Sequence, residues 1–396
     1  MTPQTQITAP RDDDDLAQYA RLAHQSFAID FDDLDVLRVH GTVRLAVSGS
    51  RVLGGVTALP VRQFFGGTEL PACCLSTVCV AADQRGRGVA RRLVEQAVRE
   101  QRESGAVVSS LWTPSMGVYR RWGWEIAGTT STYGFPMDFF VRDALRRGAL
   151  RDFAVTELMD PTEHPLHRRL AADGWNGPVD RPAWWWKWKY PQADPDSQLF
   201  ALAGADGGTH ALVGYTRKNE APWGHALEVT DYWAADPAAV DLANAFIGSH
   251  RSQAVAVRFR HGVLPDPATL LWGSDQYSGS HQHWHPWMLR LLDPRGALVR
   301  RSWPEHAFGR LDLRIVHPDT SEEDLLVTVE AGSADVVTGG TGRLRIPVTL
   351  LASWYSGALS TDRLLRRSAA DDATREDRRL LVAMSAGSRA WLPDLF

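Results

Sequence analysis

The sequence predicts a mixed α/β protein with more than one domain. The chain has 396 residues, a length that usually folds as two or three domains. Short apolar or alternating runs, typical of strands, take turns with stretches whose apolar residues recur every three or four positions, typical of helices. Hydrophobic residues make up 44% of the chain and charged residues 23%, a composition that fits a folded globular protein and excludes extensive disorder.

Charge and cysteine content narrow the class of protein further. The 43 Lys and Arg residues nearly balance the 47 Asp and Glu residues, so no basic surface is expected for nonspecific binding of nucleic acid or an anionic membrane. Cys73, Cys74 and Cys79 provide neither a disulfide framework nor paired Cys-x-x-Cys segments for zinc, which favours a reducing compartment. Residues 1–15 lack the pattern of a signal peptide, and no run of about 18 apolar residues is present. We therefore expect a cytoplasmic protein without membrane insertion.

Residues 1–150 are expected to form one α/β domain. Asp12 to Asp15 predict the start of a helix, because carboxylates suit the positive end of a helix dipole. Strands are expected at 43–49, 51–67, 75–82 and 106–112. From Gly88 to Arg102 the apolar residues form one stripe of a helix, which Ser104-Gly105 ends. Residues 113–128 predict a loop, a short helix, a glycine turn and a further strand.

Two further domains are expected after the first. Residues 151–295 repeat the strand–helix order without a matching glycine-rich turn. Their strands are expected at 200–204, 210–218, 225–234 and 254–260, and their helix at 237–250. Residues 296–396 combine strand-like segments with later helical ones and finish on the apolar sequence WLPDLF. Chain ends are usually polar and frayed, so this ending indicates that the C-terminus docks against the protein.

The strongest local feature is a strand that runs into a glycine-punctuated turn and then a helix. The turn is Gln84-Arg85-Gly86-Arg87-Gly88. Glycines let backbone N–H groups face a ligand without an intervening Cβ, and the arginines and the helix dipole add positive potential. This combination predicts an anion site of the pyrophosphate type. The spacing is neither the G-x-G-x-x-G dinucleotide fingerprint nor a P-loop, which needs a Lys and a Ser or Thr.

The segment V-C-V-A-A-D-Q-R-G-R-G-V-A at 78–90 resembles the signature of the GNAT superfamily of acyltransferases, a strand and Q/R-x-x-G-x-G/A followed by a helix. The segment GVYRRWGW at 117–124 resembles the aromatic motif of the same superfamily. In length and domain order the chain is similar to the enhanced intracellular survival (Eis) family. That resemblance implies tandem GNAT folds with mixed, mostly antiparallel sheets and a C-terminal sterol-carrier-protein-like domain. It also implies acetyl-CoA as co-substrate, no metal, and a homohexamer.

The resemblance also assigns residues to roles. The backbone of Val78, Cys79 and Val80 would pair with the pantetheine arm of acetyl-CoA. The residues expected to hold the pyrophosphate, or to lie beside the cofactor, are Arg85, Gly86, Arg87, Gly88, Val89, Ala90, Arg91, Pro114 and Ser115. Tyr119 matches the catalytic acid of the family, and the C-terminal carboxylate of Phe396 matches its base. The chain departs from the family before its last residue, where Leu395 replaces an acidic residue and Asp394 precedes it.

Several alternatives stay open at this stage. Tyr119 can be a packed aromatic, and Phe396 can simply pack while a water chain acts as base. Phe27, Asp30 and Trp112 are candidates for binding the acceptor, with Asp30 in an acidic cluster that either attracts a cationic amine or is a solvated loop.

Two further clusters have weaker claims. His281, His283 and His285 alternate as metal ligands on a strand would, yet no acidic or Cys partner lies nearby, so an ordinary polar segment is favoured. The chain has 16 Trp residues, and those at 184–188 predict an interface between domains or subunits, or the mouth of a pocket.

Together with the anion-binding turn, the resemblance implies an acetyl-CoA-dependent N-acetyltransferase. The expected acceptor is the primary amine of a small molecule, such as an aminoglycoside-like compound or a polyamine, or a lysine. Two alternatives are kept. One is a noncatalytic lipid- or CoA-binding protein, and the other is an acyltransferase that uses a longer acyl-CoA or an oxygen nucleophile.

Overall fold

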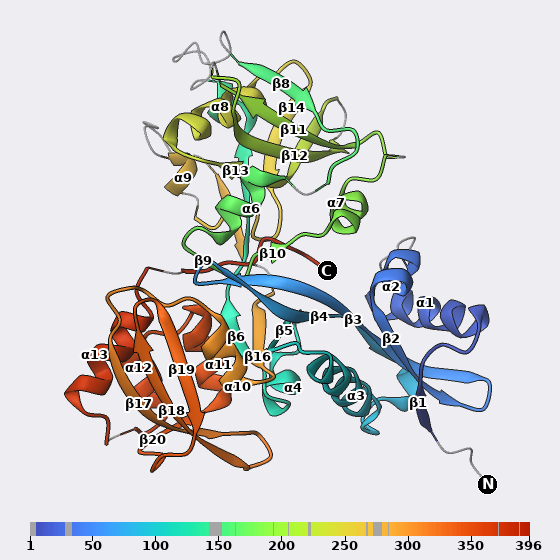
Figure 1. The fold of residues 1–396 in the computed structure, drawn as a ribbon. Helices are drawn as coiled ribbons and strands as arrows, with labels where there is room; N and C mark the ends of the chain where they lie inside the picture. Colours follow the sequence, from blue (N-terminus) through green and yellow to red (C-terminus); the bar gives the residue numbers. More distant parts are fainter. Residues whose placement is uncertain are drawn as a thin grey trace. The chain divides into compact units, whose positions relative to one another are not determined.

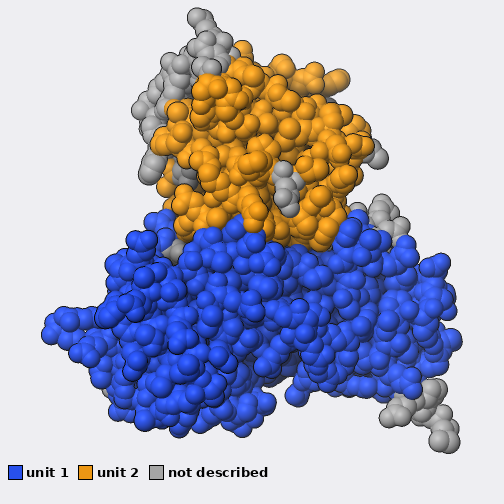
Figure 2. Space-filling view, in the orientation of Figure 1, with its two compact units in different colours: residues 1–128, 286–390, 396 blue, residues 129–285, 391–395 orange. Residues whose placement is uncertain are grey.

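The computed structural model describes the whole chain apart from residues 1–4, 28–33, 142–152, 163, 193, 205, 221–222, 267, 272–278, 284, 371 and 388. The chain forms two compact units, each made of segments that are distant in the sequence. Residues 1–128, 286–390 and 396 make the first unit, and residues 129–285 and 391–395 make the second (Figure 2). In the described part of the chain, no helix is both long enough and apolar enough to cross a membrane.

The larger sheet of the first unit holds strands in the order β1-β2-β3-β4-β5-β16-β6 (Figure 1). Their bounds are β1 Gln6–Thr8, β2 Thr42–Ser48, β3 Arg51–Phe65, β4 Thr68–Val80, β5 Val108–Trp112, β16 Trp287–Leu291 and β6 Glu125–Gly128. Neighbouring strands are antiparallel except β4 and β5, which run parallel. The helices are α1 Asp13–Phe27, α2 Leu34–His40, α3 Val89–Glu103 and α4 Met116–Arg121, with a short 3-10 turn at Ala82–Gln84.

Helices α1 and α3 cover opposite faces of this sheet. Ala46 packs in one core cluster with Leu93 of α3, while its neighbour Leu45 packs in another with Tyr19 of α1. Successive side chains of a strand point to opposite faces, so the two helices lie on the two sides. The apolar stripe predicted for 88–102 is the buried face of α3, as the sequence pattern indicated.

A β-bulge interrupts β4 close to its end. The pairing of β3 with β4 passes from Gly55 opposite Cys79 to Thr57 opposite Ser76, so two residues of β4 face one residue of β3. Thr77, at the bulge, has a φ of 52°, which is a strained conformation for a β-branched residue. The hydroxyl of Tyr19 donates to the carbonyl oxygen of Thr77 at 2.8 Å and ties α1 to the bulge.

A second, smaller sheet belongs to the same unit, in the order β19-β18-β17-β20. Its strands are β17 Gly309–Val316, β18 Glu322–Glu330, β19 Ser333–Thr338 and β20 Leu344–Pro347, and the accompanying helices are α10 Pro294–Arg300, α11 Val348–Ser356, α12 Thr361–Arg367 and α13 Arg375–Met384. Aromatic packing joins it to the larger sheet, because the rings of Phe65 and Tyr355 lie 5.1 Å apart. The Tyr355 hydroxyl donates to the carbonyl oxygen of Ala297 at 2.9 Å.

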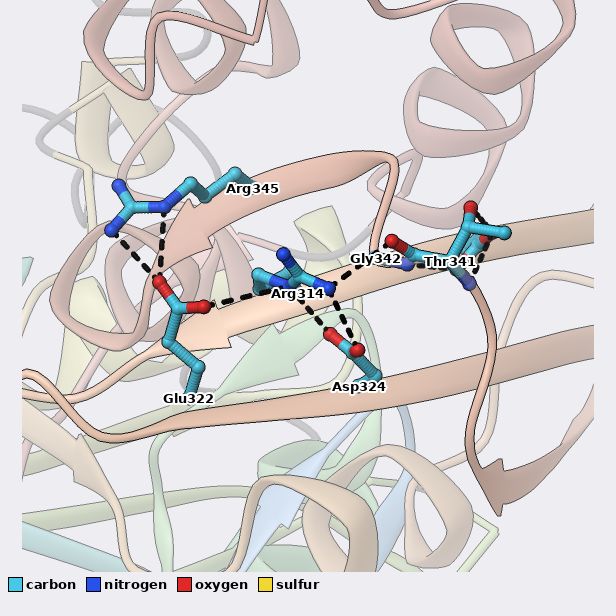
Figure 3. A network of polar contacts seen from close by, with 7 residues as sticks. Arg314, Glu322, Asp324, Thr341, Gly342 and Arg345 are labelled. Carbon is cyan, nitrogen blue, oxygen red and sulfur yellow. Dashed lines mark hydrogen bonds and ion pairs between the residues drawn. The ribbon is translucent and has the colours of Figure 1, made fainter.

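Polar contacts fasten the loop between β19 and β20 onto this smaller sheet (Figure 3). Asp312 accepts hydrogen bonds from the backbone N–H groups of Thr341 and Gly342. The guanidinium of Arg314 grips the carboxylate of Asp324 with two bonds of 2.8 and 2.9 Å, directly across the β17–β18 pair. These groups are partly exposed, so the ion pair adds little to the stability of the fold.

The second unit has a sheet in the order β15-β7-β14-β13-β12-β11-β8. The strands of this sheet are β7 Ser131–Pro136, β8 Ala154–Glu157, β11 Ser197–Ala203, β12 Thr209–Asn219, β13 His225–Ala234, β14 Ala254–Phe259 and β15 Ser280–His283. The unit also contains the short strands β9 Trp175–Asn176 and β10 Val179–Asp180 and the helices α6 Pro165–Ala172, α7 Ala183–Lys189, α8 Pro237–Gly248 and α9 Ala268–Leu271. A further short strand, β21 Arg389–Ala390, belongs to the first unit. The pair β13–β14 is parallel and is joined through α8, just as β4 and β5 are joined through α3. The repeated strand–helix order of the sequence is therefore present in the structure.

The compact units differ from the three predicted ranges. Residues 131–136 form a strand of the second unit, although they fall inside the predicted 1–150 domain. Strand β16 lies between β5 and β6 of the first unit, although it falls inside the predicted 151–295 domain. Residues 296–390 group with the first unit and not as a separate body. The reason is that strand pairing joins segments far apart in the chain, which local patterns do not reveal.

Replacing Gly55 by Ala tests the packing behind the bulge. A Cβ at this position would lie 2.5 Å from two ring carbons of Tyr19. Overpacking of this kind costs about 1–3 kcal/mol, so we expect Gly55→Ala to lower the free energy of unfolding by that amount in urea denaturation. The control is Gly117→Ala, whose Cβ would meet nothing within 4 Å and which should not destabilise the protein. Equal stability of the two variants would contradict the packing.

Candidate active site

The turn after β4 leaves a row of backbone donors open. Gly86 and Gly88 have φ values of 75° and 77°, a left-handed conformation that other residues rarely adopt. Gly88 directly precedes α3 and, having no side chain, leaves the N-terminus of the helix without a side-chain cap. Among the described residues, none accepts a hydrogen bond from the backbone N–H groups between Gly86 and Arg91. With the helix dipole, these donors form a cradle for an anion such as phosphate.

The charges around this cradle leave it positive. The nearest carboxylate, Asp83, is held by the guanidinium of Arg51 at 2.7 Å, and hydrogen bonds from Arg51 and Gln84 lower the pKa of Asp83 to about 2. Arg85 and Arg87 are exposed and have no ion-pair partner in the described part of the chain. An anion at the turn would therefore meet uncompensated positive charge.

The matching helix of the second unit offers no such cradle. At the start of α8, the carboxylate of Asp236 accepts the backbone N–H of Ala239 at 2.8 Å, and Pro237 takes the first helical position. A carboxylate at a helix N-terminus satisfies a free donor and repels a second anion. Of the two strand–helix–strand arrangements, the one in the first unit is thus suited to a phosphate.

Strands β4 and β5 part next to the cradle. Their pairing is confined to Ala72–Cys74 with Val108–Ser110, although β4 continues to Val80 and β5 to Trp112. Among the strands that the structure describes, Val80 and Cys79 pair with β3 on one side and with none on the other. Beyond the bulge, β4 therefore presents a strand edge that can pair with an extended molecule that carries amide groups.

The Cys79 side chain contributes to the wall of this region and not to its chemistry. The thiol is buried against Tyr19 and Val52, and burial raises the pKa of Cys79 to about 12. Burial raises the pKa of Cys73 to about 12 as well. Only a thiolate is nucleophilic, so neither residue is prepared to carry an acyl group.

Tyr119 lies on α4 and packs in the core cluster of the first unit. Its ring is packed edge-on against Trp122 and Trp124, with centroids 5.4 and 5.9 Å away. Its hydroxyl makes no hydrogen bond to any described residue. Burial raises the pKa of Tyr119, so the phenol stays protonated and can donate. Trp124 is held in turn by a hydrogen bond from its indole nitrogen to the carbonyl oxygen of Ser109.

The other candidate residues are spread around the first unit. Trp112 is half-buried at the end of β5, and Pro114 and Ser115 are exposed just after it. Because β4 and β5 are parallel, this end of β5 and residues 78–80 of β4 lie at the same edge of the sheet. Phe27 is 43% exposed at the end of α1, whereas Asp30 lies outside the described residues.

The last residues of the chain are divided between the two units. Phe396 is half-buried and belongs to the first unit, the unit that also contains Tyr119. The five residues before Phe396 belong to the second unit. Two further residues near the site were missed at the sequence level, Tyr19 and Thr77. Their only sequence signal is a Ser-Thr pair that interrupts an apolar strand.

The histidine and tryptophan clusters have ordinary environments. His281 stacks on Tyr133 at 5.0 Å and contacts the Ser131 hydroxyl at 2.8 Å. No group of three His, Cys, Asp or Glu side chains placed to hold a metal occurs among the residues that the structure describes. Trp185 and Trp186 of α7 are buried within the second unit, so at least these two tryptophans are core residues.

Comparison with known proteins identifies the two sheets. Residues 9–127 match one family model described as an acetyltransferase (GNAT) domain, and residues 177–291 match a second model with the same description. The chain belongs to the GNAT acetyltransferase superfamily. The cradle and the parted strands lie within the first GNAT domain, and the Asp236-capped helix lies within the second.

Full-length relatives agree with this assignment. An uncharacterized N-acetyltransferase of Streptomyces griseus is 26% identical over 367 residues, which cover 84% of this chain and 83% of the relative. A GCN5-related N-acetyltransferase from Anabaena variabilis has the same fold, with a TM-score of 0.83 and 22% identity over 99% of this chain and 100% of that one. Eis1 from Mycobacterium abscessus shares the fold with a TM-score of 0.74 and 19% identity, over 99% of this chain and 100% of that chain. This GNAT protein is thus an acetyltransferase enzyme with two GNAT domains.

Thiol titration tests whether a cysteine of this GNAT enzyme can act covalently. All three cysteines are buried. We expect the native protein to react with an aromatic disulfide reagent at about pH 8 far more slowly than the denatured protein, which should release three equivalents. Rapid reaction of one thiol in the native state would contradict the environment described for Cys79 and reopen an acyl-cysteine route.

Proposed function

We propose that the protein transfers the acetyl group of acetyl-CoA to a primary amine, on a small molecule such as an aminoglycoside-like compound or a polyamine, or on lysine. The observation that carries the proposal is the uncapped turn from Gly86 to Arg91 beside the free edge of β4. A phosphate cradle next to an unpaired strand edge matches the two chemical parts of coenzyme A, a pyrophosphate and an amide-containing arm.

In this proposal the chain's own backbone does most of the cofactor binding. The N–H groups of the turn hold the pyrophosphate, and Arg85 and Arg87 supply positive charge around it. Val78 to Val80 pair with the amides of the pantetheine arm in the space where β5 has turned away. Pro114 and Ser115 flank the arm from the end of β5. Trp112, Phe27 and Asp30 are proposed to bind the acceptor.

We also propose membership in the Eis family. The support is the likeness in fold to Eis1 over nearly the whole chain and the apolar C-terminus. Membership brings three further proposals: a sterol-carrier-like role for the small sheet and helices of 296–390, a homohexamer, and a cytoplasmic location. In that family the domain order is GNAT, degenerate GNAT-like and sterol-carrier-like, and the capped helix at Asp236 is consistent with a degenerate second domain.

The proposed chemistry needs a base for the amine and an acid for the leaving sulfur. The carboxylate of Phe396 accepts a proton from the amine, whose nitrogen then forms a bond to the acetyl carbon. As the carbon–sulfur bond breaks, Tyr119 donates its hydroxyl proton to the sulfur. A buried phenol is protonated at neutral pH before the reaction. Donation leaves a phenolate, and the proton that the Phe396 carboxylate took from the amine returns to it through solvent, which restores both groups for the next cycle.

One assay tests the function as a whole. The protein is mixed with acetyl-CoA and, in turn, an aminoglycoside, a polyamine, a lysine peptide and an alcohol, and the release of free CoA thiol is measured. We expect release that depends on an amine. Release with the alcohol, faster release from longer acyl-CoA molecules, or tight binding of acetyl-CoA without turnover would each replace the proposed reaction by another.

Replacing Tyr119 by Phe tests the acid. The ring packing against Trp122 and Trp124 remains, while the proton donor is lost. We expect kcat to fall by about 10²-fold or more, with an unchanged KM for acetyl-CoA. Tyr215→Phe is the matched control. It removes the hydroxyl of a buried tyrosine that lies in the second unit, whereas Tyr119 lies in the first, so it should leave kcat unchanged. A Tyr119→Phe enzyme with the kcat of the wild type would remove Tyr119 as the acid.

Deleting Phe396 tests the base. The deletion withdraws the terminal carboxylate by one residue, about 3.5 Å, and should lower kcat by about 10²-fold while acetyl-CoA still binds. Phe396→Leu keeps the carboxylate at its place in the chain and should retain most of the activity. If deletion and substitution lower kcat equally, the aromatic side chain matters and the carboxylate does not.

A further inference from the structure

The last residues of the chain are held firmly although they form no helix or strand. Trp391 is buried, its ring lies 4.9 Å from both Trp175 and Trp233, and its indole nitrogen donates to the carbonyl oxygen of Gly262 at 2.6 Å. Leu392 is 1% exposed, whereas Leu395 is 44% exposed. Trp391 and Leu392 therefore anchor the tail in the second unit.

The tail also carries a buried carboxylate, that of Asp394. One oxygen of Asp394 accepts from Nε of Arg181 at 2.7 Å, and the other accepts the backbone N–H of Val179 at 3.0 Å. Both side chains of the ion pair are fully buried. The remaining donors of Arg181 bind the two oxygens of Asp231 at 2.8 and 3.0 Å. One guanidinium thus joins the tail to strand β13.

The surroundings make this arrangement rigid. Asp231 also accepts from the hydroxyl of Tyr190 at 2.5 Å and the indole nitrogen of Trp233 at 2.9 Å, and the Lys189 ammonium lies 3.0 Å away. The guanidinium of Arg181 lies over the Trp186 ring at 4.6 Å. All these groups belong to the second unit. A guanidinium bound on all sides has one available position, so Asp394 does too.

Stability alone does not account for a charge in this tail. The residues before and after Asp394 in the chain, Pro393 and Leu395, are apolar. A buried ion pair stabilises a protein no better than well-packed apolar residues of similar size. What the pair supplies is direction, because charge-assisted hydrogen bonds fix a group far more narrowly than apolar contacts do. The feature so fixed lies two residues from the end of the chain.

We infer that the Arg181–Asp394 pair is a clamp that positions the C-terminal carboxylate for its role as base. Two residues reach at most about 7 Å, so the position of Asp394 limits where the carboxylate of Phe396 can lie. Arg181 and Asp394 are positioning residues and touch no reacting atom. The inference rests on the proposed function, in which Phe396 supplies the base.

The test compares Asp394→Asn in two backgrounds, the full chain and the chain that lacks Phe396. In the full chain we expect kcat to fall by about 10- to 100-fold with unchanged binding of acetyl-CoA, because a misplaced group loses rate more than affinity. In the chain that lacks Phe396, assays long enough to measure the residual rate should show no further loss. Arg181→Lys keeps one charge without the forked donors and should fall between Asp394→Asn and the wild type.

A matched control separates positioning from stability. Asp377 is another buried aspartate and lies on α13 of the first unit. The guanidinium of Arg343 donates to its carboxylate at 2.8 Å. Asp377→Asn should lower the melting temperature without lowering kcat selectively. Digestion with a carboxypeptidase adds a readout independent of turnover, because Phe396 should be released faster from Asp394→Asn than from the wild type or from Asp377→Asn.

The outcomes distinguish the clamp from the proposed function. A wild-type rate for Asp394→Asn, or the same fold loss with and without Phe396, overturns the clamp even if deletion of Phe396 is harmful. Unchanged release of Phe396 by carboxypeptidase also overturns it. Full activity after deletion of Phe396 overturns the base itself, and with it the clamp.

Discussion

The candidate site depends on two parallel strands that stop pairing before they end. β4 is held from one side by β3, and β5 is held from its other side by β16. Each strand is therefore fixed by its outer partner, while the facing edges of β4 and β5 beyond Cys74 and Ser110 make no strand pairing with each other. The bulge at Thr77 bends β4 at this point, and the hydroxyl of Tyr19 holds the carbonyl of Thr77. A strained residue anchored by a buried hydrogen bond is typical of a functional strand end.

The two GNAT domains show how little separates a phosphate cradle from a closed helix end. Both contain a parallel pair of strands joined through a helix, β4–α3–β5 and β13–α8–β14. In the first, Gly88 precedes the helix and leaves its donors open. In the second, Asp236 precedes the helix and satisfies one of them. The residue before the helix is therefore one of the features that distinguish the two helix ends as anion sites, together with the left-handed Gly86 and the exposed Arg85 and Arg87.

The sequence predicted the part of the site that local chemistry determines. A strand, a glycine turn and an amphipathic helix are neighbours in the chain, so the local structure of Val78 to Arg91 could be predicted from pattern, whereas the roles of these residues come from the resemblance. The packing of Tyr119 also follows from nearby residues, Trp122 and Trp124. The insertion of β16 between β5 and β6 could not be predicted in this way, because it joins strands about 175 positions apart, as the Trp287–Ser110 hydrogen bond with its separation of 177 shows. The bond between Arg181 and Asp394 spans 213 positions and leaves no local signal.

The clamp also bears on how a cationic acceptor would be recognised. A carboxylate near the chain end would attract an amine, but the charge of Asp394 is already matched by Arg181 and its oxygens are bonded to Arg181 and Val179. Leu395, the residue that follows, is apolar and exposed. In the proposed mechanism the charge that acts on the amine is therefore that of the terminal carboxylate and not that of Asp394. A tail that carries one functional charge needs that charge in one place, and a bound guanidinium two residues away meets this need with more precision than apolar packing can.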